Sequence, residues 1–202
     1  MTSTATKIRE IEAFIRALAL RGQPPAPHEL VWLDTLLHPL EKLDSPAAKG
    51  LRGCFFALQG EKDAAAQLPE AAIAEQPENP DEYVRHAESL ARMNDQDKAT
   101  ARYAEALQKN FDSPEQRAGI LNAFIFTALC AGKVELLREK VEEYAVLTGE
   151  EHGVVELLRS GDVVVRNGAA AQCYAAACAS GAFKDWEHPD EDEAWKHLQW
   201  AT

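Results

Sequence analysis

The stretch from residue 81 to residue 112 constrains the fold of this chain more than any other. Its small and apolar residues recur at i, i+4 and i+7 in two successive segments, which is the spacing of one face of an α-helix. The positions are Tyr83, Ala87 and Leu90 in the first segment and Ala99, Tyr103 and Ala106 in the second. Asn94 and Asp95 separate the segments and supply side-chain oxygens that can cap the second one. The stretch therefore predicts two closely packed helices joined by a tight turn.

The same pattern occurs 34 residues earlier. Four pairs of positions keep their character at this offset: Gly53 with Ala87, Phe56 with Leu90, Ala65 with Ala99, and Ala72 with Ala106. Pro69 stands where Tyr103 stands in the later unit, which predicts a bent or broken second helix in the earlier one. In the unit that follows residue 113, Lys133 and Lys140 fall at the two alanine positions, so the angle of that helix pair is not defined by the pattern.

This order of residues resembles the tetratricopeptide repeat (TPR), a helix–turn–helix unit of about 34 residues. The resemblance implies an all-α fold, a short TPR-like superhelix of antiparallel helix pairs, whose groove binds other proteins. In that family the first helix of each unit lines the concave face. Carried over to this chain, the partner-binding residues are Val84, Glu88 and Arg92 in the clear unit, Asn122 and Phe126 in the next, and Gln172 near the end.

The remaining sequence also favours helices, and the 202 residues suit one domain. We expect an N-terminal helical pair over residues 1–45, TPR-like repeats over 46–148, and a degenerate repeat with a capping helix over 149–202. Pro39 predicts a kink or a break in the second helix of the N-terminal pair. Residues 162–165 look strand-like, but four residues cannot be distinguished from a helical turn by pattern.

Charge and hydropathy limit the partners that we expect. Lys and Arg number 21 against 33 Asp and Glu, and the resulting net charge of -12 repels a nucleic-acid backbone. A basic protein partner suits this charge, although the same charge also serves solubility. No run of about 20 apolar residues indicates a membrane span. The four cysteines show no pairing pattern and the N-terminus lacks an apolar signal core, so we expect a cytoplasmic protein.

No catalytic motif, metal-binding motif or phosphate-binding loop is found in the sequence. We therefore expect no catalytic residues, no metal site and no cofactor, and a protein that is not an enzyme. The nearest approach to a ligand cluster is His188 and His197 with Asp190 and Asp192. This cluster keeps open an alternative function, a helical metal- or small-ligand-binding protein or enzyme with its site there. A solvated acidic loop explains the same residues.

Three tryptophans, Trp186, Trp195 and Trp200, lie close to the end of the sequence. They can cover the open end of a solenoid or present an aromatic anchor to a partner. Trp195 is the better anchor because it lies off the packing stripe of its helix. Taken together, these features predict an interaction protein, namely an adaptor, a chaperone or a neutraliser of a basic partner. Self-association through the apolar helix around Phe124 and Phe126 is a further possibility.

Overall fold

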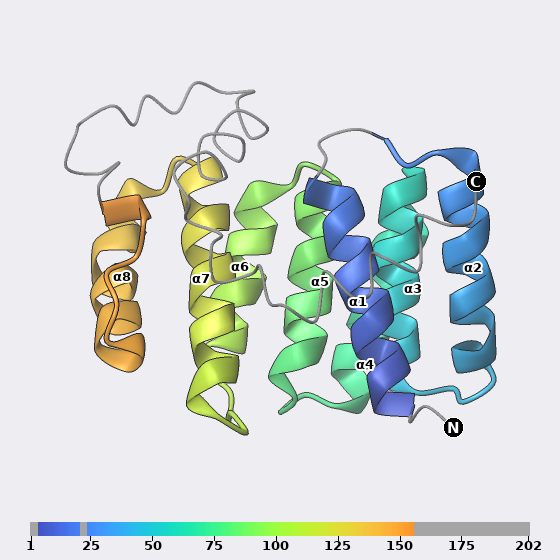
Figure 1. Ribbon diagram of the computed structural model, residues 1–202, viewed down its shortest axis with the longest axis horizontal. Coiled ribbons are helices and arrows are strands. Elements are labelled where there is room, and N and C mark those ends of the chain that lie inside the picture. Colours follow the sequence, from blue (N-terminus) through green and yellow to red (C-terminus); the bar gives the residue numbers. More distant parts are fainter. Residues whose placement is uncertain (1–3, 21–23, 156–202) are drawn as a thin grey trace.

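The computed structural model describes residues 4–20 and 24–155. These residues form eight α-helices and no strand. The helices are α1 (Thr4–Leu20), α2 (Pro27–Glu41), α3 (Pro46–Gln59), α4 (Lys62–Glu75), α5 (Pro80–Arg92), α6 (Gln96–Ala106), α7 (Pro114–Cys130) and α8 (Val134–Thr148). In Figure 1 helices α2 to α8 stand in a row, and α1 lies in front of the row between α3 and α5. The predicted all-α fold is confirmed for this part of the chain. The strand-like run at 162–165 lies outside it.

Helix pairs recur along the chain in steps of 34 residues. Helices α3, α5 and α7 begin at Pro46, Pro80 and Pro114, and each follows a capping side chain that accepts a backbone N–H of the first turn, namely Ser45, Asn79 and Ser113. Proline suits the first helical position because its missing N–H would have had no partner there. The 34-residue step is therefore built into the start of the three pairs α3–α4, α5–α6 and α7–α8.

The turns within the first two of these pairs are also equivalent. Gly60 follows α3 and Asn94 follows α5, and both have left-handed backbones with φ of 80° and 62°. After each, a backbone N–H reaches back into the preceding helix, from Glu61 to Phe56 O at 2.9 Å and from Asp95 to Leu90 O at 3.0 Å. Asparagine is one of the few residues other than glycine that tolerates this conformation. The tight turn predicted at Asn94 is confirmed.

The third pair differs because its first helix is one turn longer. Helix α7 has 17 residues and α5 has 13, and an additional four residues make about one α-helical turn. Helix α8 consequently begins at Val134, 38 residues after α6 begins at Gln96, and its buried residues are Leu137 and Val141. Leu136, one residue before Leu137, is 41% exposed.

Neither internal proline interrupts its helix. Helix α4 runs through Pro69, and α2 runs through Pro39, so neither helix is broken there, and a bend or kink at these positions stays a prediction. Gly53 leaves room for the Pro69 ring, because a Cβ atom added there would lie 2.4 Å from Cγ of Pro69, and the Ala65 carbonyl that the proline cannot bond accepts the Ser89 hydroxyl instead. The Pro69 ring thus packs against Gly53. In the next unit, Tyr103 and Ala87 occupy the two corresponding positions.

The interior consists of two clusters of buried side chains. One joins α1, α2 and α3 through residues such as Ile11, Leu33 and Leu51. The other extends from Ile73 in α4 to Val154 after α8, and it contains Phe124 and Phe126. Helix α5 contributes to the second cluster and also packs against α3. None of the described helices combines the length and the apolar character that crossing a bilayer requires.

Candidate functional site

Helix α5 is buried on a polar side as well as on its apolar side. Glu82, Arg85 and Ser89 recur at helical spacing, and all three are buried. The Ser89 hydroxyl donates to the Ala65 carbonyl of α4 at 2.8 Å. Charged residues at this spacing normally mark the solvated side of a helix. Here they are covered because α1 lies over them.

Arg85 joins α1 to α5 by paired hydrogen bonds. Its Nε and Nη2 donate to Oε1 of Glu12 at 2.9 and 2.8 Å, and its Nη1 donates to Oε1 of Glu82 at 2.6 Å. Burial opposes the charge on Arg85, but the two carboxylates outweigh it and raise the pKa of the guanidinium. Burial raises the pKa of Glu82 even though Arg85 favours its ionised form. Gly50 of α3 makes this possible, since a Cβ there would lie 2.7 Å from Cδ of Arg85.

A second ion pair between α1 and α5 lies beside the first, and in this pair the base is on α1 and the acid is on α5. Arg16 of α1 donates from Nε to Oε1 of Glu88 at 2.7 Å, and Nη1 of Arg92 lies 3.7 Å from Oε2 of Glu88. Burial opposes ionisation of Glu88, but Arg16 and Arg92 outweigh it and lower the pKa of the carboxyl. The predicted groove residues Glu88 and Arg92 thus lie together, but α1 occupies the space in front of Glu88. Val84 packs against the second core cluster.

Asn122 and Phe126, predicted for the same groove, lie in the interior. His152, in the segment after α8, bonds through Nε2 to Oδ1 of Asn122 at 2.7 Å, while its Nδ1 accepts the N–H of Val154 at 3.2 Å. The proton is therefore assigned to Nε2, and the ring is neutral. Its centroid lies 5.4 Å from that of Phe126 and 4.9 Å from that of Tyr144. These residues hold the chain after α8 against α7.

The remaining predicted site residues, Gln172 and Trp195, lie outside the described part of the chain, and so do His188 and His197. Within residues 4–20 and 24–155, no group of three or more His, Cys, Asp or Glu side chains is placed to share a metal ion.

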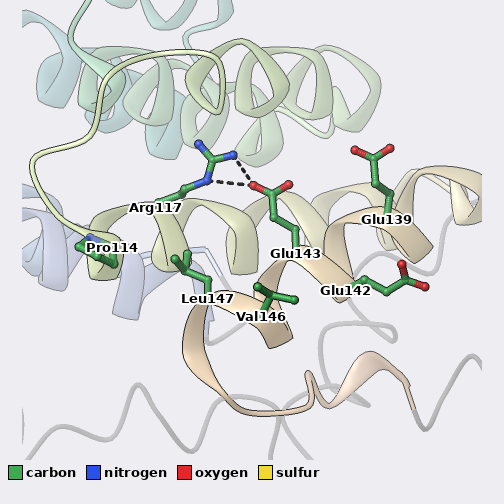
Figure 2. A pocket seen from close by; sticks show the side chains of 7 residues that line it. All are labelled: Pro114, Arg117, Glu139, Glu142, Glu143, Val146 and Leu147. Carbon is green, nitrogen blue, oxygen red and sulfur yellow. Dashed lines mark hydrogen bonds and ion pairs between the residues drawn. The ribbon is translucent and has the colours of Figure 1, made fainter.

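An open pocket of about 540 Å³ lies between α7 and α8 (Figure 2). We call it the α7–α8 pocket, and its lining residues are Pro114, Arg117, Glu139, Glu142, Glu143, Val146 and Leu147. Arg117 and Glu143 form an ion pair across it, with 2.9 Å between Nε and Oε1. The side chain of Val146 is 88% exposed, and Glu139 and Glu142 are also exposed. The pocket therefore combines two carboxylates with accessible apolar surface.

Neighbouring basic side chains favour the ionised form of Glu143 in the α7–α8 pocket. Burial opposes ionisation of Glu143, but hydrogen bonds from Lys140 and Arg117 outweigh it and lower the pKa of this carboxyl. Arg117 is thereby engaged, and Glu139 accepts a hydrogen bond from Lys140 at 3.2 Å, whereas Glu142 is exposed at the rim. A second open pocket, beside the turn from α4 to α5, is also acidic, with Glu78, Asp81 and Asp112 in its lining.

Comparison with known proteins gives no relative to guide the assignment. No family model, no curated protein and no solved structure matches the chain.

Proposed function

We propose that this protein is a protein-interaction module, an adaptor, a chaperone or a neutraliser, that binds a basic segment of a partner protein. The observation that carries this proposal is the α7–α8 pocket, where Glu139 and Glu142 flank the exposed side chain of Val146. The 34-residue step of the helix pairs supports a TPR-like array, a class of scaffold that presents binding surfaces along its length.

The pocket suits a segment that has both positive charge and an apolar anchor. Lysine or arginine side chains of the partner would approach Glu139 and Glu142, while an apolar side chain would cover Val146 and Leu147. Complementary charge of this kind speeds association and selects the partner, and the buried apolar contact supplies affinity. The net charge of -12 of the whole chain attracts basic partners from a distance.

Charge reversal in the pocket tests the proposal. The probe is a fluorescent peptide with four lysines around a Leu-Leu pair, and its binding is measured by anisotropy at low and at high salt. We expect E139K/E142K to weaken binding at least about tenfold, equivalent to about 1.4 kcal/mol. We also expect V146A to weaken it, because the anchor loses its contact surface. Added salt should weaken wild-type binding through screening.

The matched control is E10K/E61K, which changes the net charge by the same amount at two exposed positions outside the pocket. We expect this variant to bind within about twofold of the wild type, which corresponds to a few tenths of a kcal/mol. Equal weakening by both double variants would show attraction by the overall charge only. That result, or the absence of wild-type binding, would refute the assignment to the α7–α8 pocket.

A further inference from the structure

Helix α1 packs on the array in the manner of a bound helix. Helix α1 packs more extensively against α3 than against α2, although α2 follows it directly in the sequence. Two ion pairs also join α1 to α5. We call the surface that it covers the α3–α5 face, which consists of Gly50 and Cys54 of α3 with Arg85, Glu88 and Arg92 of α5. In Figure 1 α1 lies in front of the row of helices, between α3 and α5.

The contact between α1 and the α3–α5 face is complementary in both shape and charge. Ile11, Ile15 and Leu18 are buried at helical spacing along α1. Glu12 and Arg16, four residues apart, meet Arg85 and Glu88, so that an acid and a base on α1 face a base and an acid on α5. Crossed pairs of this kind specify both the register and the direction of a helix.

Helix α1 does not supply a hydrogen-bond partner to every buried charged group at the α3–α5 face. Nε and Nη1 of Arg92 are buried without a hydrogen-bond partner, and the side chain is only 9% exposed. Oε2 of Glu82 is likewise buried and unpartnered. Buried charged groups in this state cost free energy, and a ligand that supplied the missing partners would recover it. Helix α1 is therefore an incomplete match for the surface that it covers.

We propose that the α3–α5 face is a binding groove for an amphipathic helix of a partner protein, and that α1 is its built-in competitor. The partner helix has an apolar stripe with an acidic and a basic residue four positions apart, as in α1, and an additional carboxylate that pairs with Arg92. This site is separate from the α7–α8 pocket and does not depend on it.

Competition by α1 sets the affinity that such a partner would show. A tethered helix acts at an effective concentration on the order of millimolar. The partner therefore binds only the fraction of molecules whose groove is open, and its apparent affinity is reduced by that fraction. Weakening the attachment of α1 should then increase the affinity for an external helix.

The test uses the full chain and a synthetic peptide of residues 4–20 as the probe, with acetyl and amide ends and a fluorescent label. In E12R/R16E the reversed charges of α1 face Arg85 and Glu88, which repel it, while the net charge is unchanged. We expect this variant to bind the peptide at least about tenfold more tightly than the wild type. The control R9E/E10R exchanges two exposed charges of α1 and should bind as weakly as the wild type. Binding by E12R/R16E that is no tighter than the wild type would overturn the proposal.

A second measurement tests the proposal if that variant fails to fold. Cys54 is buried in the same core cluster as Ile11, its thiol donates to the Arg85 carbonyl at 3.2 Å, and burial raises its pKa to about 12. With Cys130, Cys173 and Cys178 replaced by serine, thiol labelling of Cys54 reports the opening of the groove. We expect labelling through a local opening with a weaker urea dependence than global unfolding.

Two outcomes of the labelling experiment would overturn the proposal. Labelling of Cys54 with the urea dependence of global unfolding would make α1 an integral part of the core. A dimer that forms as the groove opens, detected by light scattering, would assign the groove to α1 of a second copy instead of a partner protein.

Discussion

Replacing Arg85 with methionine lowers the free energy of unfolding by about 3–5 kcal/mol, since removing one member of a buried ionic cluster leaves its partners buried without a counter-charge. Glu82 would lose the guanidinium that now donates to it at 2.6 Å, and Glu12 would lose two hydrogen bonds. Methionine keeps most of the apolar length of the side chain, so the loss reports charge more than volume. Urea unfolding followed by circular dichroism measures the change.

The matched control is Arg102→Met. Arg102 also pairs with two carboxylates, those of Glu70 and Glu105, but both carboxylates are largely solvated. Ion pairs of this kind contribute at most about 1 kcal/mol. Equal losses for the two variants would contradict the account of a buried cluster around Arg85.

The pH dependence of the Arg85→Met variant gives an independent signature. Burial raises the pKa of Glu82, and it would act without opposition once Arg85 is removed. When the pKa of a carboxyl is higher in the folded than in the unfolded protein, its contribution to stability is fully present at pH values below the unfolded pKa, roughly 4.3. That contribution is lost as the pH rises through the folded pKa. The stability gap between wild type and variant should therefore be largest at neutral pH and should narrow as the solution is acidified.

Alanine at Gly53 lowers the free energy of unfolding by about 1–3 kcal/mol, the usual cost of overpacking a filled site. The added Cβ would lie 2.4 and 2.6 Å from Cγ and Cδ of Pro69, and a proline ring within a helix has little freedom to move. In an unobstructed helix the same change would stabilise the protein by about 0.5–1 kcal/mol, because alanine loses less backbone entropy than glycine.

Gly119 supplies that comparison within the same molecule. It is an exposed residue of α7, and no neighbouring atom lies within 4 Å of a Cβ added there. Gly119→Ala should therefore raise the free energy of unfolding while Gly53→Ala lowers it. Both are measured by urea unfolding, and changes of the same sign would show that Pro69 does not pack against Gly53 as described.

Most of the helical fold could be predicted from residue spacing, because the 34-residue step appears in the sequence in several forms. The pairing of Ala87 with Gly53 and the turn at Asn94 both follow from local preferences. The prolines at 46, 80 and 114 carry the same step more plainly, since each begins a helix. Pro69 could not be interpreted by local rules, because its tolerance depends on the missing side chain of Gly53 in another helix.

Less of the candidate site than of the helical fold could be predicted from the sequence. Glu82 and Arg85 look like the solvated side of α5, and Glu12 and Arg16 look like an exposed pair on α1. The burial of Glu82 and Arg85 and the ion pairs that α5 makes with Glu12 and Arg16 arise only when α1 lies over α5, a contact between residues 73 positions apart. The additional turn of α7 likewise delays the start of α8 to Val134, 38 residues after the start of α6 at Gln96.

If α1 covers the α3–α5 face through matched charges, Arg16 and Glu88 must be energetically coupled, and a double-mutant cycle on these two residues measures that coupling. The free energy of unfolding is measured for the wild type, Arg16→Met, Glu88→Gln and the double variant. The 2.7 Å contact between these side chains predicts a favourable coupling of roughly 0.5–3 kcal/mol, so the double variant should lose less than the sum of the single losses. Strictly additive losses would mean that the two residues do not meet, and would contradict the placement of α1 on this face.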